Sequence, residues 1–290
     1  MYDRVVITGG GGMLAQALVR SLRARGHHVV ALNRAACDVA SESDLYRTFM
    51  ELRPTLLINC AAYTKVDQAE REPDVADNVN GYAVGTLARL AKQHETALVH
   101  FSTDFVFDGT AIRPYRPDDP VNPLSTYGRS KLLGERELQS NAPPRWMIIR
   151  TAWLYGPGGP SFPQTMVTAA RAGKPLSVVN DQTGSPTFTH DLADATLELI
   201  DHGATGVWHV SNSGQTTWFD FAAAIFEEFD VKPVELKPTT SAAWKQARPA
   251  SAVRPAYSVL DTSPYERLVG KPMRPWREGL RAYRHVVEPR

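Results

Sequence analysis

The stretch from residue 4 to residue 26 constrains the fold most, because an apolar run, a run of glycines and a helical pattern follow one another there. Residues 4–8 read RVVIT, a short β-branched segment typical of a buried strand, and GGGG comes directly after it. Leucines recur at helical spacing from Leu14 to Leu22, and Gly26 ends this predicted helix as a C-cap glycine does. A strand, a tight turn and a helix in this order predict a layered α/β fold.

The same alternation of apolar runs and helical segments continues along the chain. Further strands are predicted at 27–33, 55–62, 97–103 and 145–153, and further helices at 41–54, 72–95 and 126–140. In the first of these helices, Ser41 or Ser43 is the expected N-cap. Strands that alternate with helices predict βαβ units, and therefore a parallel sheet with both faces covered.

The sequence GPGGP at 156–160 is the clearest break in this alternation, and the pattern beyond it is less regular. We therefore expect an α/β fold in two parts. Residues 1–155 would form a Rossmann-type doubly wound parallel sheet, and residues 156–290 mainly a smaller C-terminal α/β domain. In this prediction a later segment returns to the first sheet, and residues 175–181 (PLSVVND) are the candidate for it.

The composition excludes several classes of protein. The 290 residues are 43% hydrophobic and 22% charged, as in ordinary globular proteins, and the net charge of +1 provides no field to attract nucleic acid or an anionic membrane. No apolar run approaches the roughly 18 residues that a membrane helix needs. Two cysteines, Cys37 and Cys60, lie outside any metal-binding or disulfide pattern, so we expect a cytoplasmic protein without a metal site.

The glycine turn after the first strand has the pattern Gly9-x-x-Gly12-x-x-Ala15. Glycines at such a turn let the backbone approach a pyrophosphate, and the helix start at Met13 and Leu14 offers unpaired N–H groups and a positive dipole end. Alanine is accepted at the last position of this fingerprint. The alternative is an ordinary glycine turn, but its place after the first strand favours a dinucleotide site.

The end of the second predicted strand indicates which dinucleotide binds. An NAD site usually has an acidic residue there, whereas this chain has Asn33 and Arg34. An arginine suits a 2′-phosphate, so we expect NADPH, with NADH as the alternative; a solvated surface charge is the other interpretation of Arg34. Asp38 and Val39 follow a few residues later and are expected near the adenine.

Tyr127 and Lys131 are four residues apart on a predicted helix and therefore share one face. A nearby ammonium stabilises phenolate and lowers the tyrosine pKa, which suits a general acid for a carbonyl oxygen whose carbon receives hydride. A chance pair on an exposed helix would look the same in isolation. The context favours chemistry, because Thr103 ends a predicted strand and its hydroxyl can hydrogen-bond a substrate carbonyl in the crevice at the strand ends.

The sequence NCAA at 59–62 ends another strand in the same crevice. Asn59 there is either a cofactor contact or a strand-end cap. These pieces, with STD at 102–104, resemble the extended short-chain dehydrogenase/reductase family in their order and spacing. The segments INCAAYTKVDQAE, STDFVFDG, RTAWLYG, NDQTGSPT and RPAYSVLD are similar to the dTDP-4-dehydrorhamnose reductase family, and together they span nearly the whole chain.

This resemblance implies a Rossmann domain followed by a smaller substrate domain, and NADPH-dependent reduction of the C4 ketone of dTDP-4-dehydro-L-rhamnose to dTDP-L-rhamnose. It implies three groups of site residues. The catalytic residues are Thr103, Tyr127 and Lys131; the cofactor residues are Gly9, Gly12, Met13, Leu14, Arg34, Asp38, Val39, Asn59, Ala61 and Ala62, with Tyr127 and Lys131; the substrate residues are Val66, Asp67, Thr103, Asp104, Phe105, Trp153 and Arg254.

Several of these positions have a second interpretation or depart from the family pattern. Phe105 stands where the family often has tyrosine, so a hydroxyl contact is lost. Trp153 suits a sugar face, or is a core tryptophan at a domain boundary. Arg254 can pair with a diphosphate, or is a surface arginine before a proline. His190 stands where some family members hold a dimer-bridging metal through a carboxylate, so we expect a monomer or a homodimer without that metal.

Two other functions stay open at this point. A related nucleotide-sugar 4-ketoreductase or epimerase of a deoxysugar pathway would carry the same motifs. A non-catalytic, dinucleotide-binding regulatory subunit would share the fold, but it need not keep Thr103, Tyr127 and Lys131, all of which are present.

Overall fold

A parallel sheet of six strands forms the centre of the larger part of the chain in a computed structural model, which describes residues 2–289. Its strands are β1 (Val5–Thr8), β2 (Val29–Leu32), β3 (Leu56–Asn59), β4 (Ala97–Thr103), β5 (Trp146–Thr151) and β10 (Gly206–His209). They lie in the order β10-β5-β4-β3-β1-β2, so the chain turns back between β1 and β3. This confirms the doubly wound α/β fold and places its switch point beside the glycine turn.

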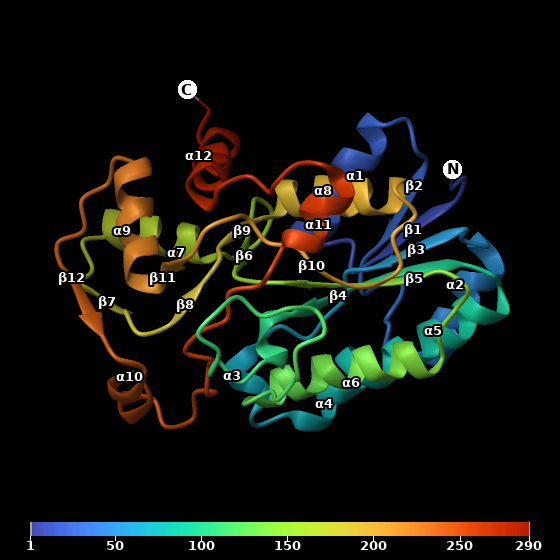
Figure 1. The fold of residues 1–290 in the computed structure, drawn as a ribbon, viewed down its shortest axis with the longest axis horizontal. Coiled ribbons are helices and arrows are strands. Elements are labelled where there is room, and N and C mark those ends of the chain that lie inside the picture. The colour runs from blue at the N-terminus through green and yellow to red at the C-terminus, as the bar shows by residue number, and fades with distance from the viewer. Residues whose placement is uncertain (1, 290) are drawn as a thin grey trace.

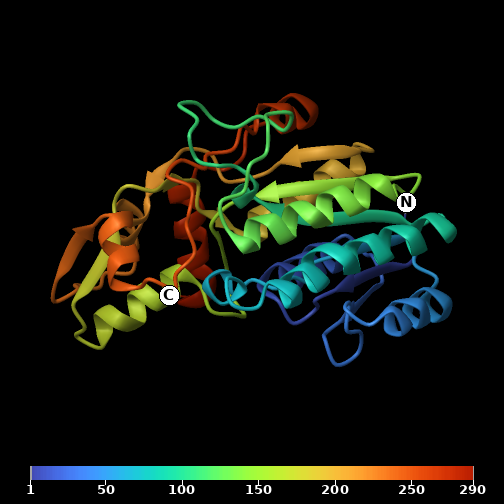
Figure 2. The same ribbon diagram turned by 90° about the horizontal axis from the view of Figure 1, so that it is seen from below.

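Helices cover both faces of this sheet (Figures 1 and 2). One face is covered by α1 (Met13–Ala24) and α8 (Thr189–Asp201), and the other by α2 (Glu42–Leu52), α5 (Ala83–Gln93) and α6 (Thr126–Ser140). Successive strand residues point to opposite faces. In β4, Val99 therefore packs in the core under α1 and α8, whereas Leu98 packs in the core under α2 and α5.

Short-range signals set the helix ends. Ser41 is the N-cap of α2, since its hydroxyl accepts a hydrogen bond from the backbone N–H of Asp44. Ser125 caps α6 in the same way through Gly128 N–H. Gly26 follows α1 with a φ of 81°, a left-handed conformation that glycine adopts without steric cost. Ser125 thus begins α6 and Gly26 ends α1, and these two helices carry predicted site residues.

The helix predicted at 72–95 is divided into three pieces, after a short helix α3 (Val66–Ala69). These pieces are α4 (Pro73–Asp77), a π-helical turn at Asn78–Tyr82 and α5. The turn directs the buried Asn80 toward α6 and the loop before α3, where its side chain binds Tyr63 N–H and Ser130 Oγ. Gly134 permits this approach, because a Cβ there would lie 2.1 Å from the Asn80 carbonyl oxygen.

The C-terminal region forms a second, smaller α/β layer with its own apolar core (Figure 1). Three two-stranded pairs occur there, β6 with β9, β8 with β11, and β7 with β12. The elements are β6 (Leu154–Tyr155), α7 (Phe162–Arg171), β7 (Leu176–Val179), β8 (Thr183–Gly184), β9 (Thr187–Phe188), β11 (Thr216–Thr217), α9 (Trp218–Glu228), β12 (Leu236–Thr239), α10 (Ser241–Ala247) and α12 (Trp276–Val287). The late helix α11 (Ser263–Val269) instead packs on α8 and β10 and adds Tyr265 to the first core. In residues 2–289, no helix has the length and apolar character to cross a membrane.

The prediction that residues 175–181 return to the first sheet is wrong. They form β7, which pairs with β12 in the C-terminal region. The sixth strand of the large sheet is β10, where Val207 packs toward one core and Trp208 toward the other. By contrast, β7 carries the exposed Ser177 and suits a sheet with one solvated face. The boundary at residue 155 stays a prediction, and α8 and β10 belong to the first core.

Candidate active site

The predicted site residues come from loops at one edge of the large sheet. Parallel strands end at the same edge, so the segments after β1, β3, β4 and β5 lie at one edge of the sheet, where folds of this class bind their ligands. The glycine turn follows β1, residues 59–62 end β3 and extend past it, Thr103 ends β4, and Trp153 follows β5. The fold therefore brings the glycine turn, from Gly9 on, to the same edge as Trp153, 144 positions later in the chain.

The glycine turn packs directly against the segment after β3. Gly9 has a φ of 69°, and a Cβ on it would lie 2.5 Å from the backbone nitrogen of Ala61. Gly10 N–H donates to the Leu32 carbonyl oxygen at 2.8 Å. The N-cap of α1 is Gly12, which offers no side-chain acceptor to the first amides of the helix. These amides can therefore receive an anionic group from a ligand.

The proline- and glycine-rich break at 156–160 lies over this helix start. Gln16 on α1 donates through Nε2 to the carbonyl oxygens of Gly11 at 3.0 Å and Gly158 at 3.3 Å. A Cβ on Gly159 would lie 2.9 Å from Met13 Cγ. The loop that begins the C-terminal region thus packs against the start of α1, where the sequence predicts the pyrophosphate.

Arg34 and Asp38 meet in the loop after β2. Arg34 Nε donates to Asp38 Oδ2 at 3.1 Å, and the arginine side chain is 83% exposed. Most of its guanidinium donors therefore face solvent. Val39, by contrast, is buried. The loop presents a positive group with unused donors at the place where the sequence predicts a 2′-phosphate.

Asn59 has its side chain inside the protein. Its Oδ1 accepts from Thr8 Oγ1 at 2.7 Å and from Ala61 N–H at 3.2 Å, and its Nδ2 lies 3.1 Å from His100 Nδ1. Thr8, Asn59 and His100 are direct register partners on β1, β3 and β4. These contacts agree with the strand-end cap, the second of the two roles considered for Asn59.

Thr103, Asp104 and Tyr127 converge at the end of β4. Thr103 Oγ1 donates to Asp104 Oδ1 at 3.0 Å, and it is close enough to the Tyr127 phenol to stabilise the phenolate. The ring of Phe105 meets the ring of Tyr127 edge to face at 5.6 Å. Gly128 permits this contact, because a Cβ there would lie 2.3 Å from the Phe105 carbonyl oxygen. The strand-end hydroxyl and the phenol therefore lie together at the end of β4.

The expected lowering of the Tyr127 pKa by Lys131 is wrong for the chain as the structure describes it. Burial and the nearby Asp104 carboxylate raise the pKa of Tyr127 to about 12, against an opposing effect of Thr103. Lys131 shares the helix face with Tyr127, but its Nζ donates to the Phe101 carbonyl oxygen at 2.6 Å and contacts His100 Nε2. Burial also lowers the pKa of Lys131 to about 8.

Asp104 is a buried carboxyl group at the centre of the site. Its side chain is only 2% exposed, and its Oδ2 has no hydrogen-bond partner within residues 2–289. Burial raises the pKa of Asp104 to about 6, opposed by the hydroxyls of Ser258 and Thr103. A buried oxygen without a partner is costly, so this atom is well suited to accept a hydroxyl from a ligand.

Asp67 and Arg254, both predicted to contact substrate, contact each other. Arg254 Nη2 donates to Asp67 Oδ1 at 2.8 Å, and the same oxygen accepts from Ala252 N–H at 3.0 Å. This pair joins α3, which begins at Val66, to the loop before α11. Both side chains stay partly exposed, so a ligand can reach the pair.

Trp153 lies between the two parts of the chain and packs against Trp218. The residue has a φ of 48°, which is uncommon for a bulky side chain, and its indole is stacked on that of Trp218. A Cβ on Gly184 would lie 2.5 Å from the Trp153 ring. Trp153 touches apolar clusters on both sides of the boundary and stays partly exposed. Trp218 carries no sequence signal, and the sequence analysis missed it.

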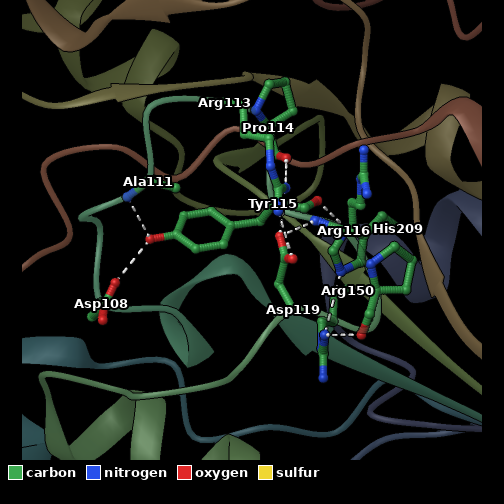
Figure 3. Close-up of polar contacts among 10 residues, drawn as sticks. Asp108, Ala111, Arg113, Pro114, Tyr115, Arg116, Asp119, Arg150 and His209 are labelled. Atoms are coloured by element: carbon green, nitrogen blue, oxygen red, sulfur yellow. Dashed lines mark hydrogen bonds and ion pairs between the residues drawn. The ribbon is translucent and has the colours of Figure 1, made fainter.

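The sequence analysis also missed a buried polar layer between the sheet and α6. Glu135 binds Arg150 through both oxygens, at 2.7 and 2.9 Å, and accepts from Ser102 Oγ at 2.5 Å. Arg150 also approaches His209, which contacts the Tyr115 carbonyl oxygen (Figure 3). This polar layer holds the loop between Thr103 and Tyr127 in place. Its signal in the sequence is an arginine or histidine inside an apolar strand.

His190 and Asp191, at the start of α8, make contacts within the chain. The His190 ring packs near Phe188, and Asp191 binds Arg274 at 3.0 Å and Asn212 at 2.8 Å. Within residues 2–289, no group of three or more His, Cys, Asp or Glu side chains is placed to hold a metal ion.

Both the sequence and the fold are similar to those of known proteins. A family model described as RmlD substrate binding domain matches residues 3–288. The dTDP-4-dehydrorhamnose reductase of Streptomyces griseus is 41% identical, over 96% of this chain and 91% of that protein. The probable dTDP-4,6-dihydroxy-2-methyloxan-3-one 4-ketoreductase of Streptomyces antibioticus is 42% identical, over 96% and 93%. The crystal structure of dTDP-4-dehydrorhamnose reductase from Bacillus anthracis in complex with NADP has a TM-score of 0.91 at 35% identity, over 98% of this chain and 99% of that one.

Proposed function

The chain belongs to the RmlD substrate-binding-domain family of dTDP-sugar 4-ketoreductases, and on that premise we propose that it reduces dTDP-4-dehydro-L-rhamnose to dTDP-L-rhamnose with NADPH. The observation that carries this proposal is the convergence of Thr103, Asp104 and Tyr127 beside the dinucleotide crevice. A regulatory subunit that only binds dinucleotide has no need of such a constellation.

The cofactor residues fit a dinucleotide phosphate. The close packing of Gly9 on Ala61 leaves no room for a side chain, and the uncapped amides of α1 suit a pyrophosphate. Arg34 supports the 2′-phosphate, and the Bacillus anthracis relative binds NADP. In this proposal Gly9, Gly12, Met13 and Leu14 hold the pyrophosphate. Asp38 and Val39 lie by the adenine end, and Ala61 and Ala62 line the crevice.

In the proposed reaction, bound NADPH supplies the hydride that the C4 carbon of the sugar receives. The phenol of Tyr127 donates a proton to the ketone oxygen, and the hydroxyl of Thr103 orients that oxygen. Lys131, on the same helix face, holds the nicotinamide ribose. The buried Oδ2 of Asp104 accepts a sugar hydroxyl.

The remaining substrate residues line the walls of this centre. Trp153 covers the C–H groups of the sugar and excludes water, and Phe105 packs behind the phenol. Val66 and the pair formed by Asp67 and Arg254 face the nucleotide end, where the arginine can leave its partner for a diphosphate.

A substrate-dependent NADPH oxidation assay with identification of the product tests this function. We expect turnover with dTDP-4-dehydro-L-rhamnose, and a loss of about 100-fold or more in Tyr127→Phe, because a positioned general acid contributes that much. The variant should still bind NADPH in a fluorescence titration. Equal turnover in both proteins would exclude Tyr127 as the acid, and no turnover with any keto sugar would favour the regulatory alternative.

A second candidate function is 4-ketoreduction of another dTDP-activated deoxysugar, and the similarity to the Streptomyces antibioticus ketoreductase favours it. Parallel assays with other dTDP-4-keto sugars and with the UDP analogue separate the two. Failure with dTDP-4-dehydro-L-rhamnose alongside success with another keto sugar would replace the first choice.

The proposed partners of the chain are NADPH and a dTDP-sugar, without nucleic acid or membrane. We place the protein in the cytoplasm, a location supported by its two free cysteines, Cys37 and Cys60. A monomer or a homodimer without a bridging metal is proposed, and sedimentation with and without a chelator checks it.

A further inference from the structure

The side chain of Lys131 lies between α6 and the sheet, and its amino group contacts two groups on β4. Its side chain is almost fully buried. Nζ lies 2.6 Å from the Phe101 carbonyl oxygen and 3.2 Å from His100 Nε2. A carbonyl oxygen accepts a hydrogen bond from an ammonium or an amine alike. The contact with the imidazole therefore decides which protonation state of Lys131 fits the site.

The orientation of the Asn59 amide is set by the backbone. Ala61 N–H can only donate, and it lies 3.2 Å from the Asn59 side-chain oxygen. The Thr8 hydroxyl donates to the same oxygen. The other end of the amide, Nδ2, is therefore the group that faces His100 Nδ1 at 3.1 Å. Because Nδ2 can only donate, His100 Nδ1 must accept.

This direction assigns the proton on the imidazole. Burial keeps the pKa of His100 well below its ordinary value, and a ring whose Nδ1 accepts a hydrogen bond cannot be doubly protonated, so the ring is neutral and carries one N–H. With Nδ1 accepting from Asn59, that N–H is on Nε2 and points at Lys131 Nζ. An ammonium has no lone pair to receive it, whereas an amine has one.

We propose that His100 is a positioning residue, which presents an N–H to Lys131 through the chain Ala61–Asn59–His100 and thereby favours the amine form of the lysine. The burial of Lys131 acts in the same direction. One consequence rests on the proposed function. His100 sets the pH below which Lys131 is protonated and gives Tyr127 a cationic neighbour.

The other ionisable groups around Lys131 do not replace this effect. On α6, Tyr127 lies one turn before it and Glu135 one turn after it. Glu135 favours the charged lysine, but its two oxygens already bind Arg150 on β5. Cys60, which follows β3, interacts weakly with the lysine charge. Asp104, after β4, acts on Tyr127. His100 is the group that touches Nζ directly.

The first test observes the imidazole of the wild-type protein. A long-range proton–nitrogen correlation spectrum distinguishes the two neutral tautomers of His100, with a His100→Asn variant to assign the signal. We expect the proton on Nε2. A proton on Nδ1, or a doubly protonated ring at neutral pH, would overturn the proposal whether or not the protein reduces a keto sugar.

The second test follows the Lys131 Cε signal with pH in protein carrying ¹³C-labelled lysine, assigned with Lys131→Arg. His100→Asn keeps an acceptor for Asn59 but removes the N–H aimed at Lys131. We expect its lysine titration midpoint to rise by about one pH unit or more, the size of an effect of one hydrogen bond to a charged group. Unchanged midpoints in the wild type and His100→Asn would contradict the proposal.

His209→Asn is the matched control. His209, on β10 beside β5, is also a buried, neutral histidine, but it faces Arg150 and the Tyr115 carbonyl oxygen. Its variant should leave the Lys131 midpoint where it is in the wild type; an equal rise in both variants would assign the shift to a general loosening of the core. If His100→Asn does not fold, the wild-type tautomer decides by itself.

Discussion

The indole of Trp153 lies face to face with the indole of Trp218, with ring centroids 3.6 Å apart and ring planes 8° apart. Trp153 leaves the large sheet after β5, whereas Trp218 begins α9 in the C-terminal region. The left-handed backbone of Trp153 costs about 1–2 kcal/mol, which its surroundings must offset. The stack therefore couples the orientation of the sugar-facing ring to the packing of the second core.

Removing this support should weaken substrate binding more than turnover. Aromatic stacking contributes about 0.5–1.5 kcal/mol beyond burial, so we expect Trp218→Ala to raise the KM for the sugar substrate about 3- to 10-fold, with a smaller change in kcat. Trp218→Phe keeps part of the stack, so its KM should lie between those of the wild type and Trp218→Ala. Steady-state kinetics measure both constants, and a KM that stays at the wild-type value in Trp218→Ala would show that the stack does not position Trp153.

Asp104 should destabilise the folded chain at neutral pH. Its pKa is raised to about 6 by burial, so between its ordinary value and this one the folded state holds the proton more tightly than the unfolded state does. Stability therefore falls as pH rises through that window. The two-unit difference corresponds to about 3 kcal/mol. We expect Asp104→Asn to raise the free energy of unfolding by about 1–3 kcal/mol at pH about 7.5, and to lose this gain near pH about 4.

Urea denaturation over a pH series measures this effect, and Asp119→Asn is a control of opposite sign. A hydrogen bond from Arg113 lowers the pKa of Asp119 to about 2. Its carboxylate therefore stabilises the fold above its ordinary pKa, and the variant should lose stability at neutral pH. A gain in Asp104→Asn that is the same at both pH values would show that packing, not the charge, is responsible.

Breaking the buried ion pair between Glu135 and Arg150 should destabilise the protein strongly. The two side chains are 2% and 5% exposed, so Glu135→Gln leaves a guanidinium buried without its counter-charge. Such a loss costs about 3–5 kcal/mol. The exposed pair of Arg277 and Glu227 is the control, and Glu227→Gln should change stability by less than about 0.5 kcal/mol. Urea midpoints that fall equally in both variants would contradict the buried role.

Arg34 should discriminate between the two dinucleotides. A hydrogen bond from a guanidinium to a phosphate contributes about 1.5–3 kcal/mol, reduced here by exposure to solvent. We expect Arg34→Ala to raise the KM for NADPH about 10-fold and to leave that for NADH nearly unchanged. Arg25→Ala, at the opposite edge of the sheet, controls for loss of surface charge. Parallel losses for both dinucleotides would remove the proposed 2′-phosphate contact.

The local elements were predictable because their signals span only a few residues. Apolar runs and leucine spacing located the strands and helices, and Gly26 and Ser41 end or begin their helices as expected. Helical spacing alone put Tyr127 and Lys131 on one face. Thr103 could be assigned to the ligand crevice because parallel strands share their carboxyl edge.

The partners of these side chains could not be predicted, because they depend on which segments become neighbours across the sheet. The sixth strand was β10, which offers apolar side chains to both cores, whereas residues 175–181 pair with β12 and carry the exposed Ser177. The pairing of β3 with β4 places His100 opposite Asn59, and the Lys131 amino group lies against β4.

By itself, then, the sequence determined the order of elements and the residue types at the strand ends, because periodicity and turn chemistry act between near neighbours in the chain. Only the tertiary structure decided the contacts of Lys131, the stack of Trp153 on Trp218 and the pairing of Asp67 with Arg254. Those contacts join residues far apart in the chain. Which residues become neighbours depends on how the whole fold buries its apolar surface, and no local sequence pattern determines it.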